Sequence, residues 1–434
     1  MTQAAGAADA PPPHDRREAL LDAAARLFNE HGVRGATLAG IAAAVGLVTN
    51  SVTHYFRKKE DLAAACFMRS IGAIDAIAAG AMRHASVASR LGAFFADYAR
   101  LLADLDERRH GQLIVFNDVR ALRGAPADEV FSAYTNLFRR MRALLDGDGT
   151  GRLGRADLNA RAHALLSAVN GVRAWIGRYE TDEYPRMTAR VADVLLHGLA
   201  APGAGWPGPG DGSASGGDGS AGAGGEGREP RAADRRHADE RANGTHAALL
   251  RAATALVNEQ GYRGASVNRI AARLALTKGA FYHHHETKEH LITQCFERTF
   301  AVEREALRRA EAGGGDGWRR ACEVARALAR FQFSDEGPLL RASAISALPD
   351  PATRERVRRT MGRLAERMAN VVVDGMIDGS IRPLDAAVAA RCVVAAVNGA
   401  AEVDRWVPGV TAGNVDELYV RPALCGVLCA ARSR

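Results

Sequence analysis

All four lysines of this 434-residue chain lie in two stretches of similar sequence, Thr37–Leu62 and Ser266–Leu291. The other basic side chains, all arginines apart from the histidines, are spread along the chain, whose net charge is +7. A lysine ammonium is a compact charge that suits a phosphate contact. The four positions are Lys58, Lys59, Lys278 and Lys288. They indicate phosphate contacts in both stretches, and the basic balance permits a polyanionic partner.

Each stretch is predicted to form two short helices joined by a tight turn. Thr37 is a suitable N-cap for the first short helix, and Ser266 occupies the same place in the second stretch. Apolar residues at helical spacing follow each cap, and the turns fall at Gly46–Leu47 and Ala275–Leu276. A helix, a short turn and a polar second helix are typical of a helix-turn-helix, whose second helix enters the major groove of DNA.

The second helix of each unit carries the side chains that could meet bases or phosphates. We expect this helix over Thr49–Tyr55 in the first unit and over Lys278–His284 in the second. The candidate contacts are Thr49, Asn50, Ser51, Thr53, His54 and Tyr55 in the first unit, and Asn268, Lys278, Gly279, Ala280, Tyr282 and His283 in the second. Because the two sets differ, we expect different half-sites and an operator that need not be a palindrome.

The two stretches belong to a longer internal duplication. Arg17–Cys66 and His246–Cys295 are identical at 21 of 50 positions, without a gap, at an offset of 229 residues. An amphipathic helix is expected over about Arg16–His31, and Gly32 ends it, as Gly261 does in the second copy. Weaker repeats follow, since Gly111–Leu122 resembles Gly337–Leu348 and Ala168–Gly171 recurs as Ala396–Gly399. We infer that the whole unit was duplicated and that its later part diverged faster.

The order of these signals resembles the TetR family of bacterial transcription regulators. The shared pattern is a first helix, T-x-x-x-I-A, a turn, a short polar helix, an aromatic and histidine cluster, and K-E-x-L, over about 50 residues in each half. The resemblance implies that Lys59 and Lys288, which open the next helix, contact backbone phosphate. It implies the same for Thr37 and Ser266. It also implies that an all-helical domain, which binds a small ligand and dimerises, follows each unit.

The two copies depart from the family pattern in different ways. In the first, Val48 replaces the usual capping Ser or Thr, at a cost of about 1 kcal/mol. Asn50 and Thr53 replace the usual Gly and Tyr. In the second, His285 stands where Phe56 supplies an apolar anchor in the first. The alternative for each copy is a helix-turn-helix core that no longer binds DNA.

Composition and pattern predict an all-α fold. The resemblance implies that each half begins with a helix-turn-helix DNA-binding domain, which a helical ligand-binding and dimerisation domain follows. The expected parts are a disordered 1–15, helix-turn-helix domain 16–65, helical domain 66–200, a flexible Gly/Pro/Ser-rich linker 201–243, helix-turn-helix domain 244–294 and helical domain 295–434. In the first helical domain, helices are expected near Leu91–Leu105, Gln112–Leu122, Ala127–Leu145, Leu158–Tyr179 and Met187–Leu199.

An effector cavity is expected only from the resemblance, and the sequence does not name its ligand. The aromatic candidates for its lining are Phe94, Tyr98, Phe116, Tyr134, Trp175, Phe331 and Trp406. Aromatic residues at helical spacing are more often ordinary core, and this interpretation stays open beside the first.

The sequence gives little indication of a membrane protein, an enzyme or a metal site. No apolar run has the length of a membrane span and the N-terminus is no signal peptide, so we expect a cytoplasmic protein without a membrane partner. We expect reduced cysteines, no catalytic motif, no cofactor and no metal site. His283–His285 makes a poor chelate. Asp146–Asp157 resembles a calcium loop, although Asp and Gly between helices are also ordinary turn residues.

The sequence as a whole predicts a DNA-binding transcriptional regulator, most simply a ligand-responsive repressor that binds a double-stranded operator and is not an enzyme. Two assemblies remain open. The halves pair within one chain as a pseudo-dimer, or two chains form a homodimer with four reading units. In a further alternative, only the second unit binds DNA and the first is an interaction or ligand-sensing module.

Overall fold

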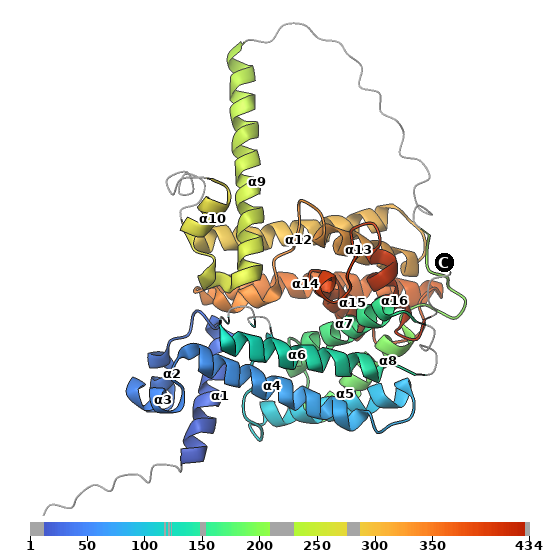
Figure 1. Ribbon diagram of the computed structural model, residues 1–434. Helices are drawn as coiled ribbons and strands as arrows, with labels where there is room; N and C mark the ends of the chain where they lie inside the picture. Colours follow the sequence, from blue (N-terminus) through green and yellow to red (C-terminus); the bar gives the residue numbers. More distant parts are fainter. Residues whose placement is uncertain are drawn as a thin grey trace, which may run out of the picture.

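The structure is a computed structural model that describes residues 13–116, 119, 122, 124–147, 153–208, 230–275 and 287–429. Within these ranges the chain forms α-helices, short 3-10 helices and one π-helical turn. The sole β-type pairing there is an isolated antiparallel bridge between Ala200 and Ile381. The expected all-α fold class is confirmed (Figure 1).

In the first half, helix α4 is the central element. The helices are α1 (Pro13–His31), α2 (Leu38–Ala44), α3 (Thr49–Tyr55), α4 (Lys59–Ala81), α5 (Val87–Asp106), α6 (Ala125–Leu144), α7 (Arg155–Val172), η2 (Ile176–Arg178), η3 (Thr181–Glu183) and α8 (Tyr184–His197). Leu20 of α1, Ile41 of α2 and Leu62 of α4 meet in one buried core. Contrary to the expectation that no apolar run reaches the length of a membrane span, α4 is long and apolar enough by length and composition alone. It packs against α1, α5 and α6.

The second half repeats this order of elements. They are α9 (Pro230–Gly264), α10 (Val267–Arg273), α12 (Lys288–Ala312), α13 (Gly317–Gln332), η4 (Ala342–Ala347), α14 (Pro351–Asp378), α15 (Ala386–Ala400), η5 (Val403–Arg405), the π-helical turn η6 (Asp416–Val420) and α16 (Arg421–Cys425). Gly261 interrupts α9 with a φ of 72°, and Gly32, with the same φ, follows the end of α1. Both glycines occupy the left-handed region, as the predicted helix stops require.

Equivalent residues of the two halves make equivalent hydrogen bonds. The side chain of Asn29 donates to the carbonyl of Leu113 at 2.9 Å and accepts from the amide of Val115 at 2.9 Å. Asn258 does the same with Leu339, at 2.8 Å, and Arg341, at 3.1 Å. We call these two arrangements the Asn29 clamp and the Asn258 clamp. Each clamp ties the first helix of its half, α1 or α9, to the segment that follows α5 or α13.

The Asn29 clamp explains one wrong prediction. A helix was expected over Gln112–Leu122, but residues 111–115 are not helical. The carboxylate of Asp22 accepts from the amide of Gln112 at 3.0 Å, and Asn29 occupies the next backbone groups. Backbone groups satisfied by side chains from α1 are not available for helix hydrogen bonds. The neighbouring predictions near Leu91–Leu105, Ala127–Leu145 and Met187–Leu199 match α5, α6 and α8 within a few residues.

The two halves pack together through α7 and α8 on one side and α15 on the other. Gly171 of α7 and Gly399 of α15, the repeated glycines of the sequence, both lie at this crossing. A Cβ at Gly171 would lie 3.0 Å from the Cβ of Ala395, and a Cβ at Gly399 would collide with Oγ of Ser167. Glycine therefore lets the two helix backbones approach closely at this point.

Polar contacts surround that crossing. The Nε2 atom of His163 lies 2.7 Å from the carbonyl oxygen of Gly399, and Arg382 pairs with Asp193 at 2.6 Å. A second ion pair joins Arg190 and Asp385. One buried cluster contains Val194 and Leu199 from the first half together with Val397 and Leu424 from the second. The two halves thus share a hydrophobic core as well as polar contacts at its edge.

The chain that leaves the first half packs on the second. Nε1 of Trp206 donates to Glu417 at 2.9 Å, and the guanidinium of Arg326 lies 4.1 Å from the centre of the Trp206 ring. Trp318 contacts the same ring and donates to the carbonyl of Gly205. The first residues of the Gly/Pro-rich segment are therefore anchored before residue 209.

Candidate nucleic-acid interface

Helix α3, the predicted recognition helix of the first unit, lies with one face in the core and the other exposed. Its bounds, Thr49–Tyr55, are those expected from the sequence. Val52 is fully buried, and Phe56, just after the helix, is 6% exposed. This packing holds α3 against α2 and leaves the opposite face free. The exposed face carries Thr49, Asn50, Thr53 and His54, while Ser51 and Tyr55 are half-buried.

The start of each first short helix is capped as the sequence predicts. Thr37 accepts from the amide of Gly40 at 3.0 Å, and Ser266 accepts from the amide of Arg269 at 3.3 Å. The start of α3 has no such cap, because Val48 has no side-chain acceptor and is 70% exposed. Within α3, the hydroxyl of Thr53 donates to the carbonyl of Asn50 at 2.8 Å. Thr53 can still accept a hydrogen bond from a ligand with its free lone pairs.

The two lysines that open α4 and α12 have a structural contact that the sequence did not indicate. Nζ of Lys59 donates to the carbonyls of Arg34, at 3.3 Å, and Ala36, at 3.1 Å. Nζ of Lys288 donates to the carbonyl of Tyr262 and lies 4.0 Å from the centre of its ring. Each lysine thus fixes the loop in front of its helix-turn-helix. The available signal was the recurrence of lysine at the same offset in both copies.

Only part of the second unit lies within the described residues. Asn268 is exposed on α10, next to the half-buried cap Ser266. Arg273 of the same helix pairs with Glu259 at 3.2 Å. The remaining candidates, Lys278, Gly279, Ala280, Tyr282 and His283, lie outside the described residues. Figure 1 draws α2, α3 and α10 at the same end of the molecule.

The aromatic residues expected around an effector lie in several environments. Phe94 and Tyr98 are buried in the bundle core, where the Tyr98 hydroxyl donates to the carbonyl of Val169 at 2.9 Å. Trp406 of the second half stacks on Phe138 of the first, with ring centroids 3.9 Å apart. The other members of the set also differ. Tyr134 packs between Phe116 and Trp406, and Phe331 is half-buried beside Arg298. Phe116 and Trp175 line a cavity between the two halves.

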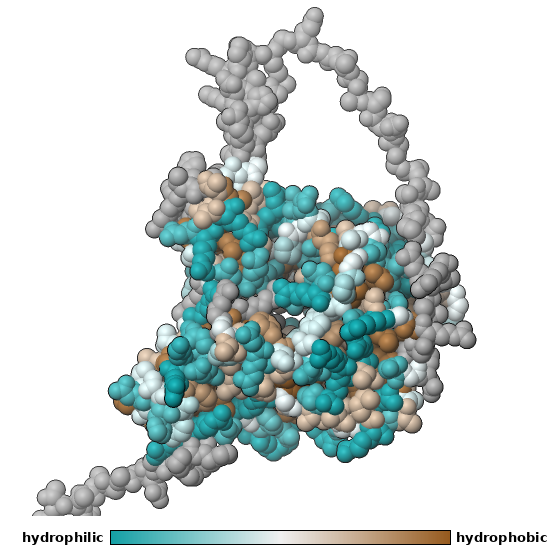
Figure 2. Space-filling view, viewed as in Figure 1, coloured by the Kyte–Doolittle hydropathy of each residue, from teal (hydrophilic) through white to brown (hydrophobic). Residues whose placement is uncertain are grey.

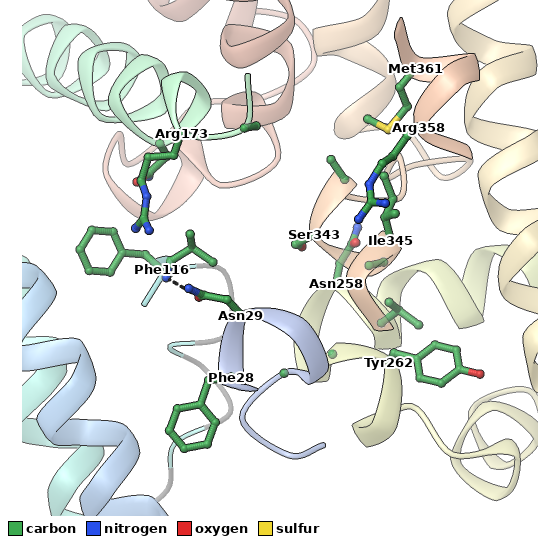
Figure 3. A pocket seen from close by; sticks show the side chains of 18 of the residues that line it. Phe28, Asn29, Phe116, Arg173, Asn258, Tyr262, Ser343, Ile345, Arg358 and Met361 are labelled. Carbon is green, nitrogen blue, oxygen red and sulfur yellow. Dashed lines mark hydrogen bonds between the residues drawn. The ribbon is translucent and has the colours of Figure 1, made fainter. Parts of the chain in front are cut away.

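That cavity has a volume of about 650 Å³ and lies between the two halves. Figure 3 shows Phe28, Asn29 and Phe116 on one side of it and Asn258, Ile345 and Arg358 on the other. The arginines among its lining residues are Arg34, Arg173, Arg178, Arg358 and Arg391. No aspartate or glutamate belongs to the lining that the structure describes. We call this space the central cavity.

The possible calcium loop is only partly described. Residues 148–152 of Asp146–Asp157 lie outside the described ranges. Asp157 lies in the first turn of α7, and the carbonyl oxygen of Asp146 accepts a 2.7 Å hydrogen bond from Arg90.

On the face drawn in Figure 2, hydrophilic side chains predominate over both halves.

Comparison with known proteins places the similarity where the duplication is strongest. The family model described as bacterial regulatory proteins, tetR family, matches residues 20–66 and again residues 249–295. The transposon Tn10 TetC protein of Escherichia coli is 34% identical over 65 residues, which are 15% of this chain and 33% of that protein. The HTH-type transcriptional repressor KstR2 of Rhodococcus jostii is 44% identical over 59 residues, 12% of this chain and 29% of the repressor. The chain thus spans about a third of the length of the curated relatives it matches.

Among solved structures, a TetR family transcriptional regulator, PfmR, from Thermus thermophilus is 24% identical. The match covers 41% of this chain and 97% of that protein, with a TM-score of 0.33. The two family matches begin and end at equivalent residues, 229 positions apart, and contain α2–α3 and α10. This chain is therefore a tandem duplication of two TetR-like units.

Proposed function

We propose that this chain is a sequence-specific, DNA-binding transcriptional regulator that acts as a repressor. The observation that carries the proposal is α3, because its buried Val52 turns a row of polar side chains outward. Thr49, Asn50 and His54 are exposed on that row. Hydroxyl, amide and imidazole groups on an exposed recognition helix suit base edges in a major groove.

In this proposal the remaining predicted residues position the unit on the DNA backbone. Thr37 and Lys59 lie at the two helix starts that flank α3, and Ser266 and Lys288 are their equivalents. Lys59 and Lys288 hold their loops through backbone carbonyls, and their positive charge at the start of α4 and α12 favours a nearby phosphate. Phosphate contacts of this kind add affinity without sequence preference.

We further propose that one chain acts as an intrachain pseudo-dimer. The close crossing of α7 with α15, the ion pairs around it and the stacking of Trp406 on Phe138 support this assembly. Because α2, α3 and α10 lie at the same end of the molecule, two reading units at that end would suit two adjacent half-sites, which lie about 34–36 Å apart on DNA. A cytoplasmic location and response to a small effector are parts of the same proposal.

Selection of DNA from a random pool with the full chain tests the proposal, together with the mass of the chain in solution. A single enriched site with unlike halves, bound by a species near the chain mass of 46.1 kDa, would support the pseudo-dimer. A doubled site bound at twice that mass would support the homodimer instead. If no site is enriched above non-specific binding, the proposed function is wrong.

The second candidate function restricts DNA binding to the second unit. The exposed Val48 and the missing cap of α3 favour it, since they weaken the helix that would read the bases. The double substitution Thr49→Ala and Asn50→Ala separates the two candidates. Loss of affinity for the selected site would support reading by α3, whereas unchanged affinity would assign the first unit to an interaction or sensing role.

A further inference from the structure

We propose that the central cavity binds one anionic, partly apolar small molecule that is held by arginines from both halves of the chain. Arg173 and Arg178 reach it from the first half, and Arg358 and Arg391 from the second. Five arginines and no carboxylate among the described lining make it a strongly positive space. Like charges that face one space repel one another, and an anion bound among them would relieve that repulsion.

The hydrogen-bond partners of Arg173 and Arg391 do not neutralise the positive charge of these side chains. Arg173 donates to the carbonyls of Leu113 and Ile114, and Arg391 to the hydroxyl of Tyr179 at 2.9 Å, all of which are neutral acceptors. Arg178 and Arg358 are exposed and form no ion pair within the described ranges. Elsewhere the arginines of this chain commonly pair with carboxylates, as Arg359 does with Glu355 and Arg186 with Glu183.

The rest of the lining combines polar side chains, such as Asn170 and Ser343, with apolar ones, and the apolar ones indicate the chemical class of the ligand. Phe116 and Trp175 belong to the lining on the first side, and Ile345 and Met361 on the second. A volume of about 650 Å³ lies within the range usual for small-molecule sites. A ligand with a phosphate or carboxylate head and an apolar body would satisfy both kinds of wall, since arginine binds both head groups in a bidentate manner.

The cavity adjoins the elements that carry the reading units. Its lining includes Asn29 and Asn258, together with Val115, which the first clamp holds, and Ala342, which follows the clamped Arg341. A ligand that draws the two sides together would act directly on α1 and α9, which precede the helix-turn-helix units. The distance between the reading units would then depend on the ligand. This last step rests on the proposed function, whereas ligand binding does not.

The anionic dye 8-anilinonaphthalene-1-sulfonate is a suitable probe, titrated by fluorescence into the full chain without DNA. We expect one site per chain. Arg178→Gln and Arg358→Gln should each weaken binding about tenfold, because each removes one charged contact. The control variants are Arg186→Gln on α8 and Arg359→Gln on α14. Neither residue lines the cavity, so both variants should leave binding unchanged. Octanoate and octyl phosphate should compete, and the stronger competitor identifies the head group.

Several outcomes would overturn the proposal. Equal weakening in the controls would show general charge attraction, and an effect of only one of the two cavity variants would place the ligand in one half. Loss of DNA affinity in both cavity variants, with unchanged dye binding, would make these arginines DNA contacts. Because the dye titration contains no DNA, its result stands even if no operator is found.

Discussion

At the scale of single residues, the two copies use equivalent polar side chains for the same local contacts, and they differ at the reading positions. Thr37 and Ser266 cap, Asn29 and Asn258 clamp, and Lys59 and Lys288 fix the preceding loop. These contacts explain why such residues recur at a constant offset. The start of α3 is the residue-scale exception, because Val48 supplies no cap.

Substitution of Val48 by Thr should therefore stabilise α3. The valine is 70% exposed, so little packing is lost, and a side-chain oxygen at this place satisfies an amide at the helix start. We expect a gain of about 1 kcal/mol, seen as slower hydrogen exchange of the α3 amides. Val52→Thr, at the buried position of the same helix, should accelerate exchange. Equal exchange in Val48→Thr and the parent chain would contradict the capping argument.

His163, at the crossing of the two halves, should make stability depend on pH. Burial lowers the pKa of its imidazole below the usual value near 6.5, although the Gly399 carbonyl, Glu402 and Asp404 oppose this shift. The unfolded chain then binds the proton more readily than the folded chain. The free energy of unfolding should fall as the pH drops below about 6.5. Urea unfolding at pH 7.5 and pH 5.5 measures this.

The variant His163→Gln should lose that part of the pH dependence. Glutamine does not titrate, and its amide can donate to the Gly399 carbonyl in place of Nε2. The surface variant His84→Gln serves as the control and should keep the dependence of the parent chain. An unchanged pH dependence in His163→Gln would contradict the assignment.

At the scale of elements, sequence patterns predicted the helix bounds and helix ends that depend on residues close together in the chain. The bounds of α3 followed from the turn and the polar run, and the stops at Gly32 and Gly261 from helix-end chemistry. The segment 111–115 could not be predicted, because a side chain from α1, 86 residues away from Val115, occupies its backbone. The central cavity was missed for the same reason, since both halves line it.

At the same scale, a substitution at Gly399 tests the close crossing of α7 with α15. Gly399→Val places a side chain where Ser167 and Tyr419 already lie, so the helices must separate or the neighbours must shift. Such overpacking costs about 1–3 kcal/mol, which should lower the urea midpoint of unfolding. Gly362→Val on α14, where no atom lies within 4 Å of the new Cβ, provides the control position. A similar loss in both variants would indicate a general effect of valine in a helix.

At the scale of the whole molecule, the two halves share one core and enclose one cavity, although they arose as separate copies of one unit. The shared core contains Val194 and Leu199 with Val397 and Leu424, and Trp406 reaches across to Phe138. Duplication normally gives two surfaces that can pair, and a pair within one chain needs no second molecule. Once both copies are joined, their reading residues can diverge independently, which the differences between the two units illustrate.

Cutting the chain between the halves should therefore leave them together. A protease site inserted within residues 209–229 lies after the anchor at Trp206 and before α9, so cleavage removes the covalent connection and spares the interface. We expect both fragments to elute together in size-exclusion chromatography at the mass of the intact chain. Adding Gly399→Val to the cleaved protein should promote separation, because the connection no longer holds the weakened halves at a high effective concentration. Separation of the fragments without that substitution would show that the linker, rather than the α7–α15 contact, keeps the two halves paired.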